Sequence, residues 1–469
     1  MVFSSLVFLF LFLPIVLTIY YVSNNKFKNY ILLLSSLFFY AWGEPKYIFL
    51  MIISIFINYI FGIKVSTNSQ SKRLWLIFSI IFNLGILVIF KYANFLIANI
   101  NSIMKINLDI PQIALPLGIS FFTFQIMSYV IDVYRREGRV QKNIFDLALY
   151  LSLFPQLVAG PIVRYQTVDE QINNREHSLN KFALGVDRFI IGLAKKVIFS
   201  NQLGLIADGV FNSQISDLST MEAWLGIICY TLQIYFDFSG YSDMAIGLGK
   251  MFGFDFLENF NYPYISQSVS EFWRRWHISL GTWFRDYVYI PLGGNRVNPI
   301  KQYRNLFVVW SLTGIWHGAN WTFIVWGLYY GMLIAIEKAF FGKILDKLPR
   351  IFRHIYLLLI VMVGWVLFRA ENIIQAIEFL KILIGRNNLL YNNSFLIYIN
   401  SSGYMVILAI LFATPIVSKV KNTIEMRNRR LVENNLAYCL HSIFLVTLMF
   451  SIVVILISST YNPFLYFRF

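Results

Sequence analysis

The stretch 305–336 reads NLFVVWSLTGIWHGANWTFIVWGLYYGMLIAI and contains no Asp, Glu, Lys or Arg. As one straight helix, its roughly 32 residues would extend about 48 Å, whereas the hydrocarbon core of a bilayer is about 30 Å thick. The stretch must therefore bend, break or re-enter. We predict a break within 313–320, where Gly314 and Gly318 flank the only ionisable side chain, His317.

The rest of the chain has the same apolar character. Of its 469 residues, 58% are hydrophobic and only 13% are charged, and the mean hydropathy is +0.62. Soluble proteins are roughly a quarter charged. Long apolar blocks cover approximately 3–21, 29–42, 46–63, 74–98, 112–133, 144–163, 182–210, 221–249, 305–336, 355–368, 403–419 and 437–458. This pattern predicts an all-α polytopic membrane protein with roughly 11–13 membrane helices, plus re-entrant or interfacial helices.

The residues between these blocks limit the possible functions. No long polar insertion interrupts the chain, so we expect one integral membrane domain over 1–469 without a soluble catalytic module. The first block lacks a basic start and a cleavage site, so it is interpreted as a retained span, and Lys26 and Lys28 favour an extracytoplasmic N-terminus. The net charge of +15 comes from Lys and Arg between the blocks. Anionic lipid explains such charges, and no nucleic-acid partner is implied.

Cys229 and Cys439 both lie inside apolar blocks. Two such residues suggest neither a disulfide framework nor a thiolate metal cluster, and we expect both to behave as small core hydrophobes. We predict no metal site.

His317 allows two interpretations. Counted from Arg304, it lies roughly 20 Å along a helix, in the membrane interior, where an imidazole is costly unless it is used or well bonded. Alternatively, Gly314 and Gly318 form a G-x-x-x-G packing surface, and His317 merely bonds a neighbouring helix.

A second polar segment covers 270–287, SEFWRRWHISLGTWFRDY. As a helix it would be amphipathic, with Trp273 and Trp276 on one face and Arg275 on the other, typical of an interfacial or re-entrant helix. His277 lies one turn beyond Trp273, so it would point with the apolar face. The simpler interpretation is a membrane-surface helix with snorkelling arginines and an incidental histidine.

A third segment, 236–243, brings Asp237 and Asp243 into an apolar block. Carboxylates there need partners, such as nearby serines or an arginine from another segment. Structural fastening is the favoured interpretation, although one carboxylate could orient a histidine. His177, His354 and His441 are interpreted as structural.

Taken together, these strings resemble the membrane-bound O-acyltransferase superfamily, in particular its bacterial branch that acylates cell-surface polysaccharides. The matching pieces occur in the expected order: LVAGPIVR at 157–164, DFSGYSD at 237–243, NYPY at 261–264, FWRRWH at 272–277, YIPLGGNR at 289–296 and GIWHGAN at 314–320. The resemblance implies a central tunnel, N-terminal spans over 1–110, a catalytic core over 111–345 and C-terminal spans over 346–469.

The resemblance also implies roles for particular residues. His317 corresponds to the superfamily's catalytic histidine and His277 to its second active-site histidine. The C-terminal PFLYFRF at 463–469 is similar to an aromatic motif whose tyrosine, here Tyr466, is proposed to accept the acyl group. Substrate binding or structural support is expected from Trp316, Asn320, Trp273, Arg274, Arg275, Trp276, Asp237 and Asp243.

The same resemblance implies a cytoplasmic thioester donor, acetyl-CoA in the acetylating members, and no permanently bound cofactor. It implies a location in the bacterial cytoplasmic membrane and a separate extracytoplasmic esterase-like transferase that modifies a polysaccharide such as peptidoglycan or alginate. D-alanylation of teichoic acid is the alternative within the family.

Two other classes stay open at this point. A broken helix and intramembrane carboxylates would also suit a transporter or flippase, although no inverted repeat is visible and the histidines would be unexplained. A non-catalytic scaffold could use the same strings for helix contacts.

Overall fold

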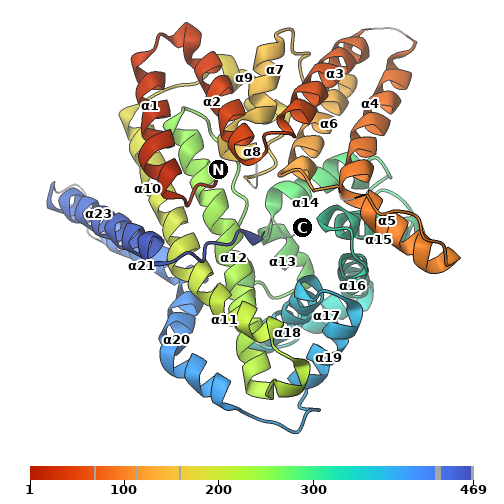
Figure 1. The fold of residues 1–469 in the computed structure, drawn as a ribbon, viewed down its shortest axis with the longest axis vertical. Helices are drawn as coiled ribbons and strands as arrows, with labels where there is room; N and C mark the ends of the chain where they lie inside the picture. Colours follow the sequence, from red (N-terminus) through yellow and green to blue (C-terminus); the bar gives the residue numbers. More distant parts are fainter. Residues whose placement is uncertain (68–69, 112, 158–159, 428–434, 466–469) are drawn as a thin grey trace. The chain divides into compact units, whose positions relative to one another are not determined.

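The computed structural model describes residues 1–67, 70–111, 113–157, 160–427 and 435–465. Every regular element in these ranges is a helix, which confirms the predicted all-α class (Figure 1). The chain forms two compact units, the first comprising Met1–Phe189 and Ser242–Leu257, the second Ile190–Tyr241 and Glu258–Phe469. Helices α10 (Leu179–Ala194) and α12 (Thr220–Met251) contribute residues to both.

In the first unit, α3, α4 and α6 lie side by side, and α2 packs along α7 (Figure 1). Asn58 and Asn83 join α3 to α4 through reciprocal amide hydrogen bonds of 3.1 and 2.7 Å, because buried polar groups in an apolar bundle must pair between helices. The elements are η1 (Phe8–Phe12), α1 (Leu13–Val22), η2 (Asn25–Phe27), α2 (Lys28–Gly43), α3 (Ile48–Ser66), α4 (Lys72–Leu87), η3 (Val88–Tyr92), α5 (Ala93–Met104), α6 (Ile119–Arg135), α7 (Ile144–Ser152), α8 (Phe154–Leu157) and α9 (Tyr165–Asn174).

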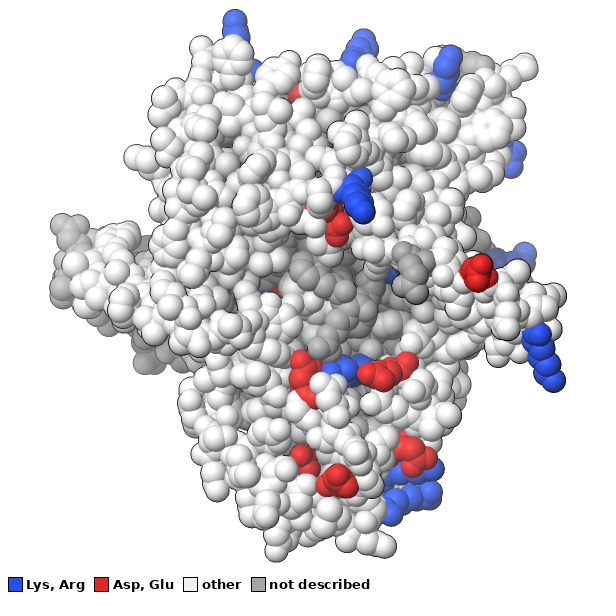
Figure 2. Space-filling model, viewed as in Figure 1, with Lys and Arg blue, Asp and Glu red and all other residues white. Residues whose placement is uncertain are grey.

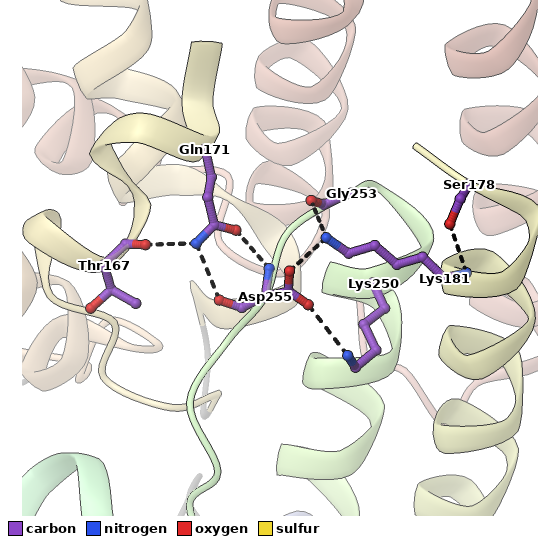
Figure 3. A network of polar contacts seen from close by, with 7 residues as sticks. All are labelled: Thr167, Gln171, Ser178, Lys181, Lys250, Gly253 and Asp255. Atoms are coloured by element: carbon purple, nitrogen blue, oxygen red, sulfur yellow. Dashed lines mark hydrogen bonds and ion pairs between the residues drawn. The ribbon is translucent and has the colours of Figure 1, made fainter. Parts of the chain in front are cut away.

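A polar network around Asp255 ties α9, α10 and the end of α12 together (Figure 3). The Asp255 carboxylate lies 2.6 Å from Lys181 Nζ and 3.3 Å from Lys250 Nζ, and its backbone N–H donates to Gln171. Burial opposes ionisation of Asp255, but the hydrogen bonds and charges of the two lysines outweigh it and lower the pKa of this carboxyl. All residues of this network belong to the first unit.

The second unit carries most of the sequence features singled out above. Its further elements are η4 (Lys195–Ser200), α11 (Asn201–Asn212), η5 (Ile215–Asp217), η6 (Pro263–Ile265), α13 (Val269–Arg275), α14 (Ile278–Phe284), η7 (Arg285–Tyr289), α15 (Pro299–His317), α16 (Trp321–Ile336), η8 (Glu337–Phe341), α17 (Gly342–Leu345), α18 (Arg350–Arg369), α19 (Ile373–Leu383), α20 (Asn393–Phe412), α21 (Ile416–Arg427) and α23 (Asn435–Ser458). Large aromatic side chains, among them Trp326, Trp365 and Tyr330, are fully buried in its core.

The long uncharged stretch breaks where the sequence predicted. Helix α15 ends at His317, and α16 begins at Trp321. The two helices lie side by side (Figure 1). A methyl group on Gly314 would collide with the Phe323 carbonyl oxygen, so glycine is what allows this close approach.

The 270–287 segment is not one continuous amphipathic helix. It divides into α13 and α14 because Trp276 is extended (φ −105°, ψ 128°) and His277 is left-handed (φ 46°, ψ 54°). The expectation that His277 points with an apolar helical face is therefore wrong in its geometry, although the ring is buried.

Six helices in the described residues are long and apolar enough to cross a membrane: Ile48–Ser66, Lys72–Met104, Trp321–Leu345, Arg350–Arg369, Asn393–Phe412 and Ala437–Ser458. The other predicted blocks form helices that are shorter or carry more polar residues. Figure 2 shows one face of the molecule, which is mostly uncharged, with acidic and basic side chains in isolated groups. These features define a multi-pass membrane protein. Cys229 is buried as expected, whereas Cys439 is exposed on α23, which corrects its assignment to a protein core.

Candidate active site

His317 is the last residue of α15 and is only 8% exposed. Three aromatic rings surround its imidazole in edge-on contacts, with ring centres 5.1 Å away for Trp316, 4.9 Å for Trp326 and 5.2 Å for Phe368. Asn320 begins α16, where its side-chain oxygen caps the Thr322 N–H at 3.1 Å. The cap and the glycines together fix the turn that holds the imidazole.

A buried cavity of about 20 Å³ lies against His317. Its lining residues are mainly apolar: Ile234, Asp237, Phe238, Trp276, His317, Trp326, Trp365, Phe368 and Leu465. A cavity needs roughly 10–15 Å³ to hold one water molecule. The space therefore accepts about one water, and an acyl group would require the surrounding side chains to move.

His277 lies close to this site but does not line the cavity. Its Nδ1 is 3.2 Å from Asn259 Oδ1 and 3.4 Å from Ser279 Oγ, and Asn259 Oδ1 also accepts the Ser279 N–H and O–H. The ring is 2% exposed and contacts Phe238 (4.6 Å) and Trp316 (6.2 Å). Trp316 thus contacts both histidines, and an amide and a hydroxyl, not an aspartate, lie at His277 Nδ1.

The other predicted residues of the 272–277 string lie in different environments. Trp276 lines the His317 cavity, and Trp273 packs against Trp310, Trp326 and Tyr330. Arg275 pairs with Glu271 at 3.0 Å, one helical turn away.

Arg274 lines a second, larger cavity of about 670 Å³. Charged side chains of both signs border this space: Glu271, Arg274, Glu337, Lys338, Asp346 and Arg353. Glu337 also fixes the start of α13, where its carboxylate accepts the N–H groups of Val269 (2.7 Å) and Ser270 (3.0 Å). A carboxylate at a helix N-terminus satisfies donors that the helix itself leaves open.

The two predicted aspartates of α12 are both in ion pairs. Asp237 Oδ1 lies 2.6 Å from Lys196 Nζ in the second unit, and Asp243 Oδ1 lies 2.5 Å from an Arg188 guanidinium nitrogen in the first. Asp237 is the one that lines the His317 cavity.

Tyr466 lies outside the described residues, and so do Val158 and Ala159 of the 157–164 string. The chain is described as far as Leu465, which lines the His317 cavity. Among the described residues, no group of three or more His, Cys, Asp or Glu is arranged to hold a metal.

Sequence reasoning missed several residues of this site: Lys196, Asn259, Ser279, Trp326, Trp365 and Phe368. The buried lysine carried the clearest signal, because a cation within the apolar block 182–210 needs an anion such as Asp237. The aromatic residues carried none, since apolar blocks are rich in them throughout.

Comparison with known proteins identifies the family to which the chain belongs. Residues 132–371 match the MBOAT, membrane-bound O-acyltransferase family. The chain therefore belongs to this family, and it is a multi-pass membrane O-acyltransferase.

Its relatives include a probable alginate O-acetylase, AlgI, of Azotobacter vinelandii, which is 49% identical over 380 residues, 80% of this chain and 76% of the relative. The peptidoglycan O-acetyltransferase of Helicobacter pylori is 37% identical over 458 residues, 88% of this chain and 86% of that protein. A teichoic acid D-alanyltransferase of Bacillus subtilis is 30% identical over 244 residues, 48% and 59% of the two chains. The family assignment favours the enzyme over the transporter and scaffold interpretations.

Proposed function

We propose that this enzyme transfers an acetyl group from a cytoplasmic thioester, acetyl-CoA, toward a hydroxyl of an extracytoplasmic polysaccharide, with His317 as the general base. One observation carries the proposal: the His317 imidazole and Leu465, the residue directly before Tyr466, line the same buried cavity. An imidazole in such a place can take the proton of a hydroxyl that belongs to the chain's own C-terminal segment.

In the first step, His317 takes the proton of the Tyr466 phenol as its oxygen attacks the thioester carbonyl. The new C–O bond forms, the C–S bond breaks, and the imidazolium returns its proton to the departing thiolate. The products are an acetyl-tyrosine ester and free CoA.

His277 has a positioning role in this proposal. Its ring contacts Trp316, the neighbour of His317 in sequence, and Asn259 and Ser279 lie at its Nδ1. We propose that these contacts hold the His277 and Trp316 rings in place beside the reacting carbonyl. Donor binding then requires the aromatic lining to open into the tunnel that the family resemblance implies.

We further propose that a separate esterase-like transferase outside the bacterial cytoplasmic membrane takes the acetyl group from Tyr466 and delivers it to the polymer. Similarity to a probable alginate O-acetylase, which is 49% identical over 80% of this chain, favours alginate as the acceptor. Peptidoglycan is the second candidate, since the relative that acts on it is similar over 88% of the chain.

Transfer of D-alanine is the other donor chemistry within the family. The D-alanyltransferase relative is similar over 48% of this chain, compared with 80% and 88% for the two O-acetylating relatives. This difference in coverage favours acetyl over D-alanyl.

The test uses purified protein in detergent with radiolabelled acetyl-CoA. Label should appear on the wild-type protein, at a position lost in Tyr466→Phe, which keeps the ring and removes the nucleophile. Full labelling of Tyr466→Phe would refute the acyl-tyrosine step, and label supplied only by a D-alanyl thioester would refute the acetyl donor.

A further inference from the structure

A buried ion pair joins η4 to α12 in the second unit. Lys196 Nζ lies 2.6 Å from Asp237 Oδ1, and the two side chains are 3% and 2% exposed. Removing two charges from water costs several kcal/mol per ion, and their attraction repays this only when the other donors and acceptors are also satisfied. The pair therefore needs further polar partners.

The C-terminal segment supplies those partners from its backbone. Lys196 Nζ donates a hydrogen bond to the carbonyl oxygen of Pro463, and Asp237 Oδ2 accepts the N–H of Leu465 at 2.9 Å. Lysine can donate three hydrogen bonds and accepts none, whereas a carboxylate only accepts. Lys196 thus binds the Pro463 carbonyl, and Asp237 binds the Leu465 N–H two residues further along. The positive and negative groups of the pair therefore face an acceptor and a donor of the segment in the matching order.

Side chains of the same segment add three further contacts. Tyr461 O–H donates to Asp208 Oδ2 at 2.6 Å, Asn462 contacts Asn201 at 3.3 Å, and the Phe464 ring lies 4.8 Å from the ring of Tyr241. Figure 1 shows the segment after α23 running back across α12. Five consecutive residues are therefore attached to one unit.

The attachment ends at the candidate active site. Asp237 and Leu465 both line the cavity at His317, and Tyr466 follows Leu465 in the chain. One carboxylate thus forms part of the cavity wall and holds the last described amide of the segment.

We propose that Lys196 and Asp237 form a receptor for the main chain of the C-terminal segment, and that this receptor positions the residues just before Tyr466 at the His317 cavity. The function of the receptor rests on the acyl-tyrosine step proposed above, but its existence does not. Lys196 and Asp237 are positioning residues. They act on the acceptor segment and not on the acetyl group.

The experiment measures how fast a maleimide labels a cysteine in the segment. The reporter is Phe464→Cys, at a position that is 7% exposed, in a Cys439→Ser background, because Cys439 is exposed. Cys229 is buried and serves as the internal control for an intact fold. The parent reporter should be labelled slowly; fast labelling would contradict the docked segment.

Two kinds of variant then disrupt the contact, one by changing the ion pair and the other by changing the backbone of the segment. Lys196→Met with Asp237→Leu removes both charges together, which avoids leaving one buried charge unpaired. Leu465→Pro removes the N–H that Asp237 accepts and leaves the ion pair in place, and Leu465→Ala, which keeps the N–H, is its matched control.

We expect the double variant and Leu465→Pro to be labelled about tenfold faster than the parent and Leu465→Ala, the factor that corresponds to losing one hydrogen bond to a charged group. Cys229 should stay unlabelled. If the maleimide labels Cys229 in the double variant, that variant has unfolded. The comparison of Leu465→Pro with Leu465→Ala alone then tests the receptor. If Leu465→Pro is labelled at the same rate as the parent and Leu465→Ala, the proposed receptor is refuted.

Acetyl transfer is measured in the same samples to separate the two proposals. Faster labelling with less acetylation supports the receptor and the acyl-tyrosine step together. Faster labelling with full acetylation would show that the receptor holds the segment but that transfer does not depend on this positioning. Tyr466→Phe in the same assay shows separately whether the acyl-tyrosine step occurs.

Discussion

At the scale of single residues, the two histidines owe their places to different backbone features. His317 ends a 19-residue helix, where the partial negative charge of the helix terminus stabilises the imidazolium that a general base becomes. His277 occupies a left-handed backbone conformation between two short helices. The sequence predicted the burial of both rings but not these conformations, because a left-handed histidine leaves no periodic signature.

The backbone at His277 gives a stability prediction. Asparagine tolerates the left-handed region and β-branched residues do not, so His277→Val should unfold more easily than His277→Asn by about 1–2 kcal/mol. Thermal unfolding in detergent checks this difference, and acetylation should fall in both variants. Equal stability of the two variants would mean that the φ of 46° is not kept in solution.

His177 gives a pH prediction outside the membrane-spanning helices. Burial, followed by the charges of Lys28, Arg175 and Lys181, lowers the pKa of His177 to about 4. An unfolded histidine titrates near pH 6.5, so between about pH 6.5 and 4 the unfolded chain binds a proton that the folded chain does not. Stability from this source is present above that window and is lost as the pH falls through it.

The measurement is the thermal midpoint of wild type and His177→Gln at a series of pH values. The wild-type midpoint should fall more steeply than that of His177→Gln between about pH 6.5 and 4. Parallel curves would show that His177 does not contribute. The ring's contact with Tyr20 O–H, at 2.7 Å, is the interaction most directly affected.

At the scale of elements, the pair formed by α15 and α16 carries His317, and the break between the two helices could be predicted because length alone forbids a straight span. The division of 270–287 could not be predicted in the same way. Its aromatic periodicity fits one amphipathic helix, and the extended Trp276 and left-handed His277 that separate α13 from α14 leave no mark in that pattern. The start of α13 is fixed locally by Ser268, whose Oγ accepts the Glu271 N–H at 3.1 Å, and by the carboxylate of the distant Glu337.

Close approach of α15 and α16 at Gly314 gives the second stability prediction. Gly314→Ala should destabilise the protein by about 1–3 kcal/mol, because its methyl group meets the Phe323 carbonyl and the backbone of Gly327. Gly85→Ala in α4, where nothing lies within 4 Å of the added carbon, is the control and should be neutral or slightly stabilising. Equal effects in chemical denaturation would argue against tight packing of the two helices.

At the scale of the whole molecule, composition predicted a polytopic all-helical protein, and motif order predicted its family. The detailed site needed tertiary structure, because Lys196, Asn259 and Phe368 meet the histidines or Asp237 only after distant segments pack together. The spacing of residues along the sequence does not predict these contacts.

The apolar exterior gives a prediction about membrane insertion. Val446 is 69% exposed near the middle of the span Ala437–Ser458, so Val446→Lys should oppose insertion of that helix by about 2.5–3.5 kcal/mol. Leu390→Lys, in an exposed segment between α19 and α20, is the control and should insert normally. Resistance to alkaline extraction from membranes reports the difference, and equal extraction of both variants would refute a lipid-facing position for Val446.

We propose His317 as the base on which acyl transfer depends. The most direct test compares acetylation by purified wild type, His317→Ala and His354→Ala, with labelled acetyl-CoA as donor; His354 is the control because its Nδ1 lies 3.0 Å from the Ser266 backbone carbonyl, away from the cavity lining. We predict that His317→Ala accumulates as a folded membrane protein and transfers no acetyl group, while His354→Ala retains transfer. Acetyl transfer by folded His317→Ala at the wild-type rate would show that His317 is not the base.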